Sequence, residues 1–362
     1  MIYQSLVKPL MFRMEAEQSH DTMYQFARKA SSSELLKGLA KMAYNYQSPK
    51  LSQKISGIPF QNPIGLAAGF DKNGHIPEII EALGFGFIEI GSITGNPSTG
   101  NPKPRLFRLP KDHALINRMG LNNDGAKTIV KRLRNKDVSV PLGVNIAKTH
   151  DPNIMGDLAI QDYVHSFMEA RKIADYITIN ISCPNTTEGK TFEEPSALDE
   201  LLTALNIRDD ARTIPTMVKF SSDLTEKALI NLLQICEDHQ IQGYVACNTS
   251  SMRSGLKTGN TKLNRIGRGG LSGRPIAQKS IQIIRWISRE LNGQKPIIGV
   301  GGIDSFTTAL KMLLAGADLL QVYSGLIYEG PGLVKAINKE LKNQLDELHV
   351  KSIHQLVSAT SE

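Results

Sequence analysis

Amides and lysines recur where short apolar segments of this sequence end. Such side chains cost free energy in an apolar strand unless they find hydrogen-bond partners, and a flat polar ligand at the strand ends would supply them. One asparagine alone is typical of a turn or a helix cap, but five polar strand ends together favour a ligand site. The side chains concerned are Lys72, Asn145, Asn180, Lys219 and Asn248.

One cysteine, Cys183, follows the fourth of these segments, between a serine and a proline. A free cysteine is usually a small buried hydrophobe, but a loop position among amides favours a chemical role. A thiol with a reference pKa of about 8.5 can remove a proton when a nearby cation lowers that pKa. We therefore interpret Cys183 as a candidate base, Cys236 as a core residue, and Cys247 as a residue that lines the same site.

Glycines gather after the last two apolar segments, at residues 299–302 and at residue 325. Glycine lets backbone N–H groups approach a phosphate, and the last two loops of a β/α barrel often bind one. Other motifs fail. Gly189-Lys190-Thr191 lacks the glycine that a P-loop needs five positions earlier, and no complete GxGxxG follows a strand. Without HExxH, GxSxG or a Cys/His zinc spacing, we predict no metal site.

The elements that must position these residues are eight short apolar segments, which we predict to be buried strands. The intervals between most of them have helical apolar spacing, as at residues 225–239, 275–291 and 305–315, the last capped by Asp304. Apolar strands alternating with helices predict a parallel sheet covered on both faces. Eight units favour an α/β fold of the closed (β/α)8 TIM-barrel type, with an open doubly wound sheet as the alternative. The strands are expected at residues 64–69, 86–93, 142–147, 176–182, 216–220, 243–247, 296–300 and 319–323.

The first 50 residues differ from the rest of the chain. They predict short helices at residues 6–12, 20–30 and 33–46, with Ser33 capping the last. Basic residues outnumber acidic ones in these helices. A basic amphipathic unit of this kind can lie on a membrane, but the pattern alone favours a helical cap packed on its own barrel. At the other end, residues after Gln344 are expected to fray.

Composition bounds the function classes. The chain has 362 residues, of which 41% are apolar and 21% charged, so it can bury a sizeable core, and disordered classes are excluded. Its net charge of +7 suits anionic partners. No aromatic-interleaved basic stripe occurs, so we expect no nucleic-acid partner. The cysteine count, the N-terminal pattern and the lack of a long apolar window indicate an intracellular protein that does not cross a membrane.

Seven segments in order resemble the dihydroorotate dehydrogenase family, specifically its membrane-associated, quinone-reducing class. They are LAAGFDK at 66–72, IEIGSIT at 88–94, KPRLFR at 103–108, INRMGLNN at 116–123, NISCPNT at 180–186, GGLSGRP at 269–275 and IIGVGG at 297–302. The resemblance implies a β/α barrel that holds FMN and oxidises (S)-dihydroorotate to orotate in de novo pyrimidine synthesis. A base takes the C5 proton, the C6 hydride passes to the flavin, and a quinone then accepts the electrons through the N-terminal helices. The implied parts are a membrane and quinone-access unit (1–50), an FMN-binding barrel (51–342) and a tail (343–362).

The resemblance also assigns residues to roles. Cys183 stands at the base position, and His20 and Arg108 match positions near the quinone entrance. Positions that match FMN-binding ones are Ala68, Gly69, Lys72, Ser92, Asn145, Asn180, Lys219, Cys247, Gly273, Gly302, Tyr323 and Ser324. Positions that match those around the substrate are Lys72, Asn117, Arg118, Met119, Gly120, Leu121, Asn180, Asn185, Asn248 and Thr249.

Three positions depart from the pattern of the quinone-reducing class. Cys183 stands where serine is usual, Cys247 where threonine is common, and Leu121 where phenylalanine is common. Because the soluble classes share the cysteine, a fumarate- or NAD-linked dihydroorotate dehydrogenase stays open as an alternative, as does a non-catalytic basic binding protein. The N-terminal helices and residues 117–123 favour the quinone class. We therefore expect dihydroorotate and a membrane quinone as partners, and peripheral attachment to the cytoplasmic face of the inner membrane.

Overall fold

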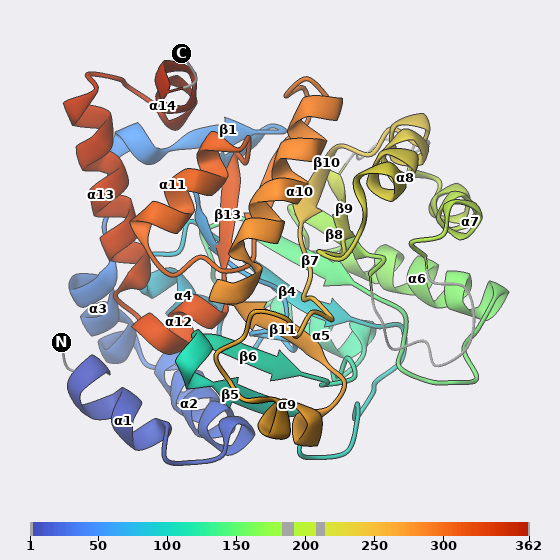
Figure 1. The fold of residues 1–362 in the computed structure, drawn as a ribbon, viewed down its shortest axis with the longest axis horizontal. Coiled ribbons are helices and arrows are strands. Elements are labelled where there is room, and N and C mark those ends of the chain that lie inside the picture. The colour runs from blue at the N-terminus through green and yellow to red at the C-terminus, as the bar shows by residue number, and fades with distance from the viewer. Residues whose placement is uncertain (1–2, 183–191, 208–213, 361–362) are drawn as a thin grey trace.

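Eight parallel strands close into a barrel at the centre of the molecule (Figure 1). The computed structural model describes residues 3–182, 192–207 and 214–360. Around the barrel the strand order is β10-β12-β13-β3-β4-β7-β8-β9. The strands are β3 (Ile64–Leu66), β4 (Phe87–Ile93), β7 (Leu142–Ile146), β8 (Tyr176–Asn180), β9 (Thr216–Phe220), β10 (Gly243–Ala246), β12 (Ile297–Val300) and β13 (Leu319–Val322). Each lies within a predicted segment, so the TIM-barrel prediction is confirmed.

Helices follow the strands and cover the outside of the barrel (Figure 1). They are α4 (Pro77–Ala82), α5 (Ala126–Leu133), α6 (Asp157–Ala170), α7 (Pro195–Leu205), α8 (Glu226–Asp238), α10 (Ala277–Glu290), α11 (Phe306–Leu314) and α13 (Leu333–Glu347). One predicted cap is wrong: Ser305, not Asp304, caps α11. Its hydroxyl accepts from Thr308 N, and the Thr308 hydroxyl accepts from Ser305 N, which forms a capping box.

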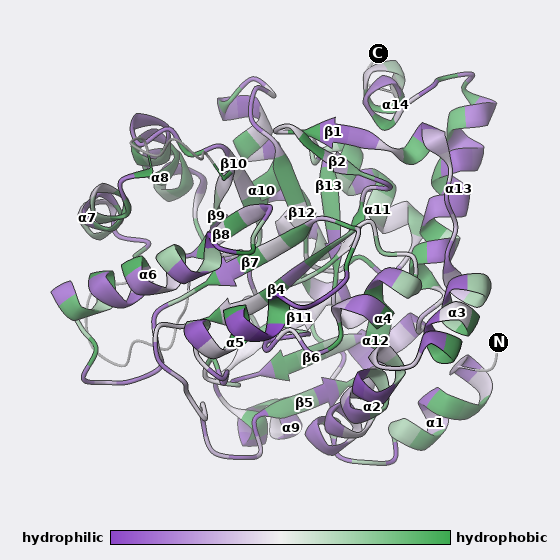
Figure 2. Cartoon of the chain, turned by 180° about the vertical axis from the view of Figure 1, so that it is seen from behind, coloured by the Kyte–Doolittle hydropathy of each residue, from purple (hydrophilic) through white to green (hydrophobic). Residues whose placement is uncertain are grey.

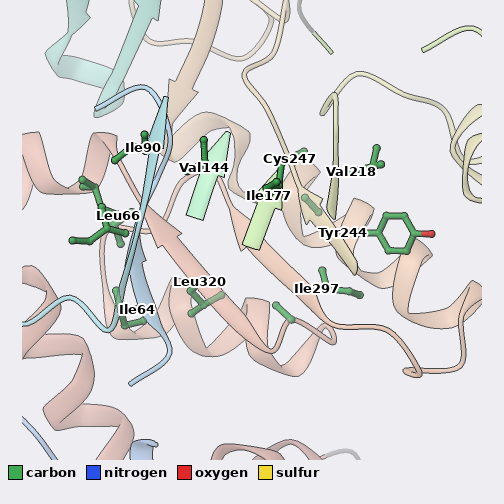
Figure 3. Packing of buried hydrophobic residues seen from close by; sticks show 14 of the residues in the cluster. Ile64, Leu66, Ile90, Val144, Ile177, Val218, Tyr244, Cys247, Ile297 and Leu320 are labelled. Atoms are coloured by element: carbon green, nitrogen blue, oxygen red, sulfur yellow. The ribbon is translucent and has the colours of Figure 1, made fainter. Parts of the chain in front are cut away.

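Side chains alternate along the barrel strands between two cores. Ile64, Leu66, Val144 and Leu320 point outward and pack in the large core beneath the helices (Figure 3). Inside the barrel, Phe87 meets Phe60 edge-on at 5.4 Å between ring centroids. Phe60 comes from a hairpin of β1 (Gln53–Ile55) and β2 (Ile58–Phe60). One end of the barrel is thus filled by apolar side chains, and polar groups gather at the other.

A three-stranded antiparallel sheet outside the barrel was not predicted. It has the order β11-β6-β5, with β5 (Leu106–Leu109), β6 (Ala114–Asn117) and β11 (Gly270–Gly273). Its strands have four residues each, and half of β11 is glycine, so no local β pattern marks it. Three short helices lie close to it in sequence: η3 (Pro110–Asp112), α9 (Asn260–Ile266) and η5 (Arg274–Ile276). This sheet carries the residues that follow Asn117 to the barrel mouth.

The N-terminal helices are η1 (Tyr3–Val7), α1 (Lys8–Met11), α2 (Ala16–Ser31), α3 (Glu34–Tyr44) and the short η2 (Pro49–Leu51). Of these helices, α2 packs against β5 and α4, α3 packs against α4, and η2 packs against α13 (Figures 1 and 2). Ser33 caps α3 as predicted, since its hydroxyl accepts from Leu36 N at 3.3 Å. The second helix begins four residues earlier than predicted. Within the described residues, no helix is both long enough and apolar enough to cross a bilayer.

The C-terminal residues differ from the expectation of fraying. Helix α13 ends at Glu347, and a further helix, α14 (Ile353–Thr360), follows it. Ile353 and Leu356 are 3% and 1% exposed and belong to the main core. Burial of two such side chains contributes on the order of 3–6 kcal/mol, which holds this segment on the barrel.

Candidate active site

A cavity of about 1340 Å³ opens at the carboxyl ends of the barrel strands. The predicted residues that line it are Ala68, Gly69, Lys72, Ser92, Asn117, Arg118, Met119, Gly120, Leu121, Asn180, Lys219, Cys247, Asn248, Thr249, Gly273, Gly302, Tyr323 and Ser324. Asn145 lies just behind this lining, fully buried and bonded to Ser92. Cys183 and Asn185 lie outside the described residues. The residues predicted from separate strands therefore meet at one mouth.

A chain of amides and hydroxyls forms one wall of the cavity. Asn248 Nδ2 donates to Asn180 Oδ1 at 3.2 Å and to Ser182 Oγ at 2.8 Å. Asn180 Nδ2 donates to Ser92 Oγ at 3.2 Å, and Ser92 Oγ donates to Asn145 Oδ1. These bonds fix which amide atoms point into the cavity, so the wall is preorganised for a planar ligand with fixed donors and acceptors.

Glu89 lies beneath this wall, inside the barrel, and is fully buried. Its carboxylate accepts four side-chain hydrogen bonds: from Asn145 Nδ2 at 2.9 Å, Tyr176 Oη at 3.1 Å, Thr178 Oγ1 at 3.1 Å and Gln321 Nε2 at 2.8 Å. Glu89 was not among the predicted site residues, although a charged residue inside an apolar strand is a usable signal.

Lys219 stands on β9, in register with Asn180 on β8. It is only 5% exposed. Burial lowers the pKa of its ammonium group, while the negative charge of Glu89 raises it. Burial also raises the pKa of the Cys247 thiol to about 12, which makes Cys247 a neutral lining residue. Lys219 is thus a buried basic group in a wall otherwise lined by amides, hydroxyls and a thiol.

Lys72 follows β3 on a turn that Asp71 organises. The buried Asp71 carboxylate accepts from His75 N at 3.0 Å, Ile76 N at 2.9 Å and Tyr24 Oη at 2.7 Å. Burial and the charge of Arg105 lower the pKa of Lys72 to about 8, against the opposing effect of nearby carboxylates. An anionic ligand would restore the full charge of Lys72, so this residue favours an anion at its end of the cavity.

The opposite side of the cavity fits a cofactor with a flat ring. Gln321 Oε1 is buried and finds no hydrogen-bond partner among the described residues, so a ring N–H of a bound group would satisfy it. Near it, Gly273 and Gly302 have φ of 97° and 85°, which favours glycine. A Cβ atom at Gly273 would lie 2.3 Å from His113 O, so packing also requires glycine there. Gln321 was not among the predicted site residues.

Tyr323 connects the cavity to the N-terminal helices. Its ring meets Phe70 at 5.5 Å, Phe70 meets His20 at 6.0 Å, and His20 stacks on Tyr24 at 5.8 Å. His20 is therefore one ring removed from the cavity lining. Arg108 lies outside the cavity lining and donates to the carbonyls of Met11 and Met14 at the end of α1.

Arg118 fastens loops together at the rim. Its guanidinium donates to Ile266 O, to Arg268 O at 3.1 Å and to Pro104 O at 3.1 Å, and lies 4.7 Å from the Phe107 ring centroid. These contacts hold the α9–β11 connection against the segment before β5. Arg118 shapes the cavity through its contacts with backbone carbonyls.

Fold and site together define a β/α-barrel enzyme whose mouth accommodates a flat cofactor and a small anion. A model of the family described as dihydroorotate dehydrogenase matches residues 50–345. A dihydroorotate dehydrogenase (quinone) from Christiangramia forsetii is 39% identical over 344 residues, which are 94% of this chain and 98% of that one. One of the same description from Proteus mirabilis is 41% identical over 342 residues, covering 93% and 99%.

The solved structures agree with these relatives. The crystal structure of DHODH from Eimeria tenella in complex with ferulenol superposes with a TM-score of 0.80 at 31% identity and covers 95% of each chain. The present chain belongs to the dihydroorotate dehydrogenase family, in its quinone-dependent group.

Proposed function

We propose that the protein oxidises (S)-dihydroorotate to orotate in pyrimidine biosynthesis and passes the electrons to a quinone. The observation that carries this function is the meeting of Lys72, the Asn180–Asn248 amides and Lys219 at one mouth, in a chain about 40% identical to quinone-dependent relatives. The cofactor we propose is FMN, which when bound would accept a hydride from the substrate and pass the electrons on to the quinone.

The residues of the chain divide the remaining work. Lys72 pairs with the substrate carboxylate by a charge-assisted hydrogen bond. The amides of Asn180 and Asn248 bind the donors and acceptors of the pyrimidine ring, as their fixed orientation allows. Lys219 stabilises negative charge that develops on the cofactor ring. We assign the removal of the C5 proton to Cys183, which directly follows the cavity-lining Ser182 in the sequence.

The N-terminal helices are the proposed route of the quinone. His20 on α2 reaches the cavity wall through Phe70 and Tyr323. Exposed apolar side chains on these helices support peripheral attachment at the cytoplasmic face of the inner membrane. They include Leu6, Leu10, Phe26, Leu35 and Met42, which are 58–77% exposed.

An anaerobic half-reaction experiment tests this proposal. The purified protein is expected to show flavin absorbance, to lose it on addition of dihydroorotate, and to regain it on addition of ubiquinone. Mass spectrometry of the released cofactor tests FMN against other flavins. Rapid reoxidation by fumarate or NAD, and not by ubiquinone, would favour the soluble alternative. A colourless protein that binds no added flavin would contradict the function itself.

A further inference from the structure

Two backbone segments pack against each other at the end of the cavity where we propose that the substrate binds. One comprises residues 99–105 and the other residues 117–121. Asn101 N donates to Met119 O at 3.1 Å, and Asn101 Nδ2 donates to Arg118 O at 2.9 Å. A Cβ atom on Gly100 would lie 2.1 Å from Met119 O. The shape of the turn that lines the cavity is thus set by the segment behind it.

This turn is a costly conformation. Gly120 and Leu121 follow each other with φ of 72° and 50°. Glycine adopts this region freely, but leucine does not, so Leu121 is strained. Strained residues persist only where their surroundings fix them. The turn therefore needs an external support.

Arg105 provides that support from within the first segment. Its Nη1 donates to Thr99 O at 2.7 Å, to Asn101 O at 2.9 Å and, at a longer 3.5 Å, to Met119 O. Its Nε donates to Glu17 Oε1 at 3.0 Å. Both side chains are buried, and Glu17 lies on α2, in the N-terminal unit. Lys103 Nζ also lies 3.3 Å from Glu17 Oε1, but the Lys103 side chain is 61% exposed. Removal of Glu17 would leave the buried Arg105 charge without its carboxylate partner, which is strongly unfavourable.

We propose that Glu17 and Arg105 are positioning residues for dihydroorotate: through their ion pair, helix α2 holds the substrate-binding turn in place. The inference rests on the proposed function of the cavity. It gives the N-terminal unit a second task beside quinone access, because the helix that carries His20 also shapes the turn at residues 117–121. Dihydroorotate binding is then not separable from the N-terminal helices.

The charges of Glu17 and Arg105 also affect the pKa of Lys72. The charged groups that act on Lys72 are Arg105, Asp71 on its own turn, and Glu17 and Asp21 on α2. Glu17 favours the charged form of Lys72, and Arg105 opposes it. Loss of the Glu17 charge therefore lowers the pKa of Lys72. As the pH rises, anion binding by the variant should begin to weaken at a lower pH than in the wild type.

The test is Glu17→Gln in the full-length holoenzyme, with Glu34→Gln as the matched control. Glu34 lies on the neighbouring helix α3, where its carboxylate is 91% exposed. For Glu17→Gln we expect the dissociation constants of dihydroorotate, from rapid-mixing flavin reduction, and of orotate, from calorimetry, to rise ~10-fold. The rate of flavin reduction at saturation and the KM for ubiquinone should stay within about twofold of the wild type. Glu34→Gln should change none of these quantities.

Further variants separate positioning from general damage. Glu17→Asp, which keeps the charge, should show a smaller loss of orotate affinity, and this variant carries the test if Glu17→Gln does not fold. Glu17→Gln combined with Arg105→Lys should bind orotate no more weakly than Arg105→Lys alone, because the two residues act as a unit. Unchanged orotate affinity in Glu17→Gln, or a rise confined to the KM for ubiquinone, would overturn the proposal. Failure of the wild type to be reduced by dihydroorotate would instead refute the proposed function.

Discussion

Replacement of Glu89 by glutamine tests whether the carboxylate inside the barrel organises the site. The carboxylate accepts one hydrogen bond on Oε1 and three on Oε2. A glutamine of the same shape has only one acceptor oxygen, and its amide nitrogen would face a donor. In the least unfavourable orientation, the amide oxygen keeps Tyr176, Thr178 and Gln321, and the Asn145 donor loses its partner.

The cost follows from this count. A buried donor left unpaired costs about 1–3 kcal/mol, and the three remaining bonds lose their charge assistance. We expect Glu89→Gln to lower the free energy of unfolding by about 3 kcal/mol. The entropy of unfolding scales with chain length, and for 362 residues it is about 0.8 kcal/mol/K. The expected fall in Tm is therefore about 4 °C.

Cofactor retention gives a second measurement on the same variant. Asn145 orients Ser92, and Ser92 in turn accepts from Asn180, so the loss should spread into the amide wall. We expect weaker flavin binding in equilibrium dialysis together with the lower Tm from scanning calorimetry. Glu200→Gln, at an exposed position on α7, is the control. A Glu89→Gln protein with unchanged Tm and unchanged flavin affinity would refute the reasoning from hydrogen-bond counts.

Three further predictions follow from the site and the N-terminal helices. Since the pKa of Lys72 is about 8 in the free enzyme and an anion requires its charged form, orotate affinity should be constant below about pH 7 and fall as pH rises through 8, up to tenfold per pH unit. Calorimetric titration from pH 6 to pH 10 measures this profile, and the Lys72→Met variant should bind orotate weakly and without that pH dependence. Cys183→Ala should stop flavin reduction with FMN still bound, whereas Cys183→Ser should keep partial activity with a changed pH profile, since a hydroxyl is a far weaker acid than a thiol. Near-full turnover of the alanine variant in stopped-flow measurements would remove Cys183 from the mechanism. Replacement of Leu10, Leu35 and Met42 by serine should reduce flotation with anionic liposomes without lowering the rate of flavin reduction by dihydroorotate, because these side chains are exposed and take no part in the cavity. Equal flotation of variant and wild type would count against attachment through these helices.

Local sequence patterns were enough to predict the barrel and most of its mouth. Apolar segments separated by helical spacing predict strands and helices from local periodicity alone, so each barrel strand lies within its predicted segment. Because the carboxyl ends of parallel strands meet at one end of a barrel, the sequence predicts without any distances that Lys72, Asn180 and Asn248 line one site. The helix cap at Ser33 could also be predicted from local sequence, because it requires only the Ser33 hydroxyl and the backbone N–H three residues later.

Groups whose role depends on partners far away in the sequence could be identified only from the folded molecule. Strand β11 exists because β6 pairs with it, since its glycine-rich sequence carries no β preference. Glu89 and Gln321 become a unit across 232 positions, and Glu17 meets Arg105 across 88. Residues 353–360 are ordered because Ile353 and Leu356 find a core to enter. Periodicity reports what one stretch of chain prefers, whereas the pairing of buried polar and apolar groups depends on which stretches the closed barrel brings into contact.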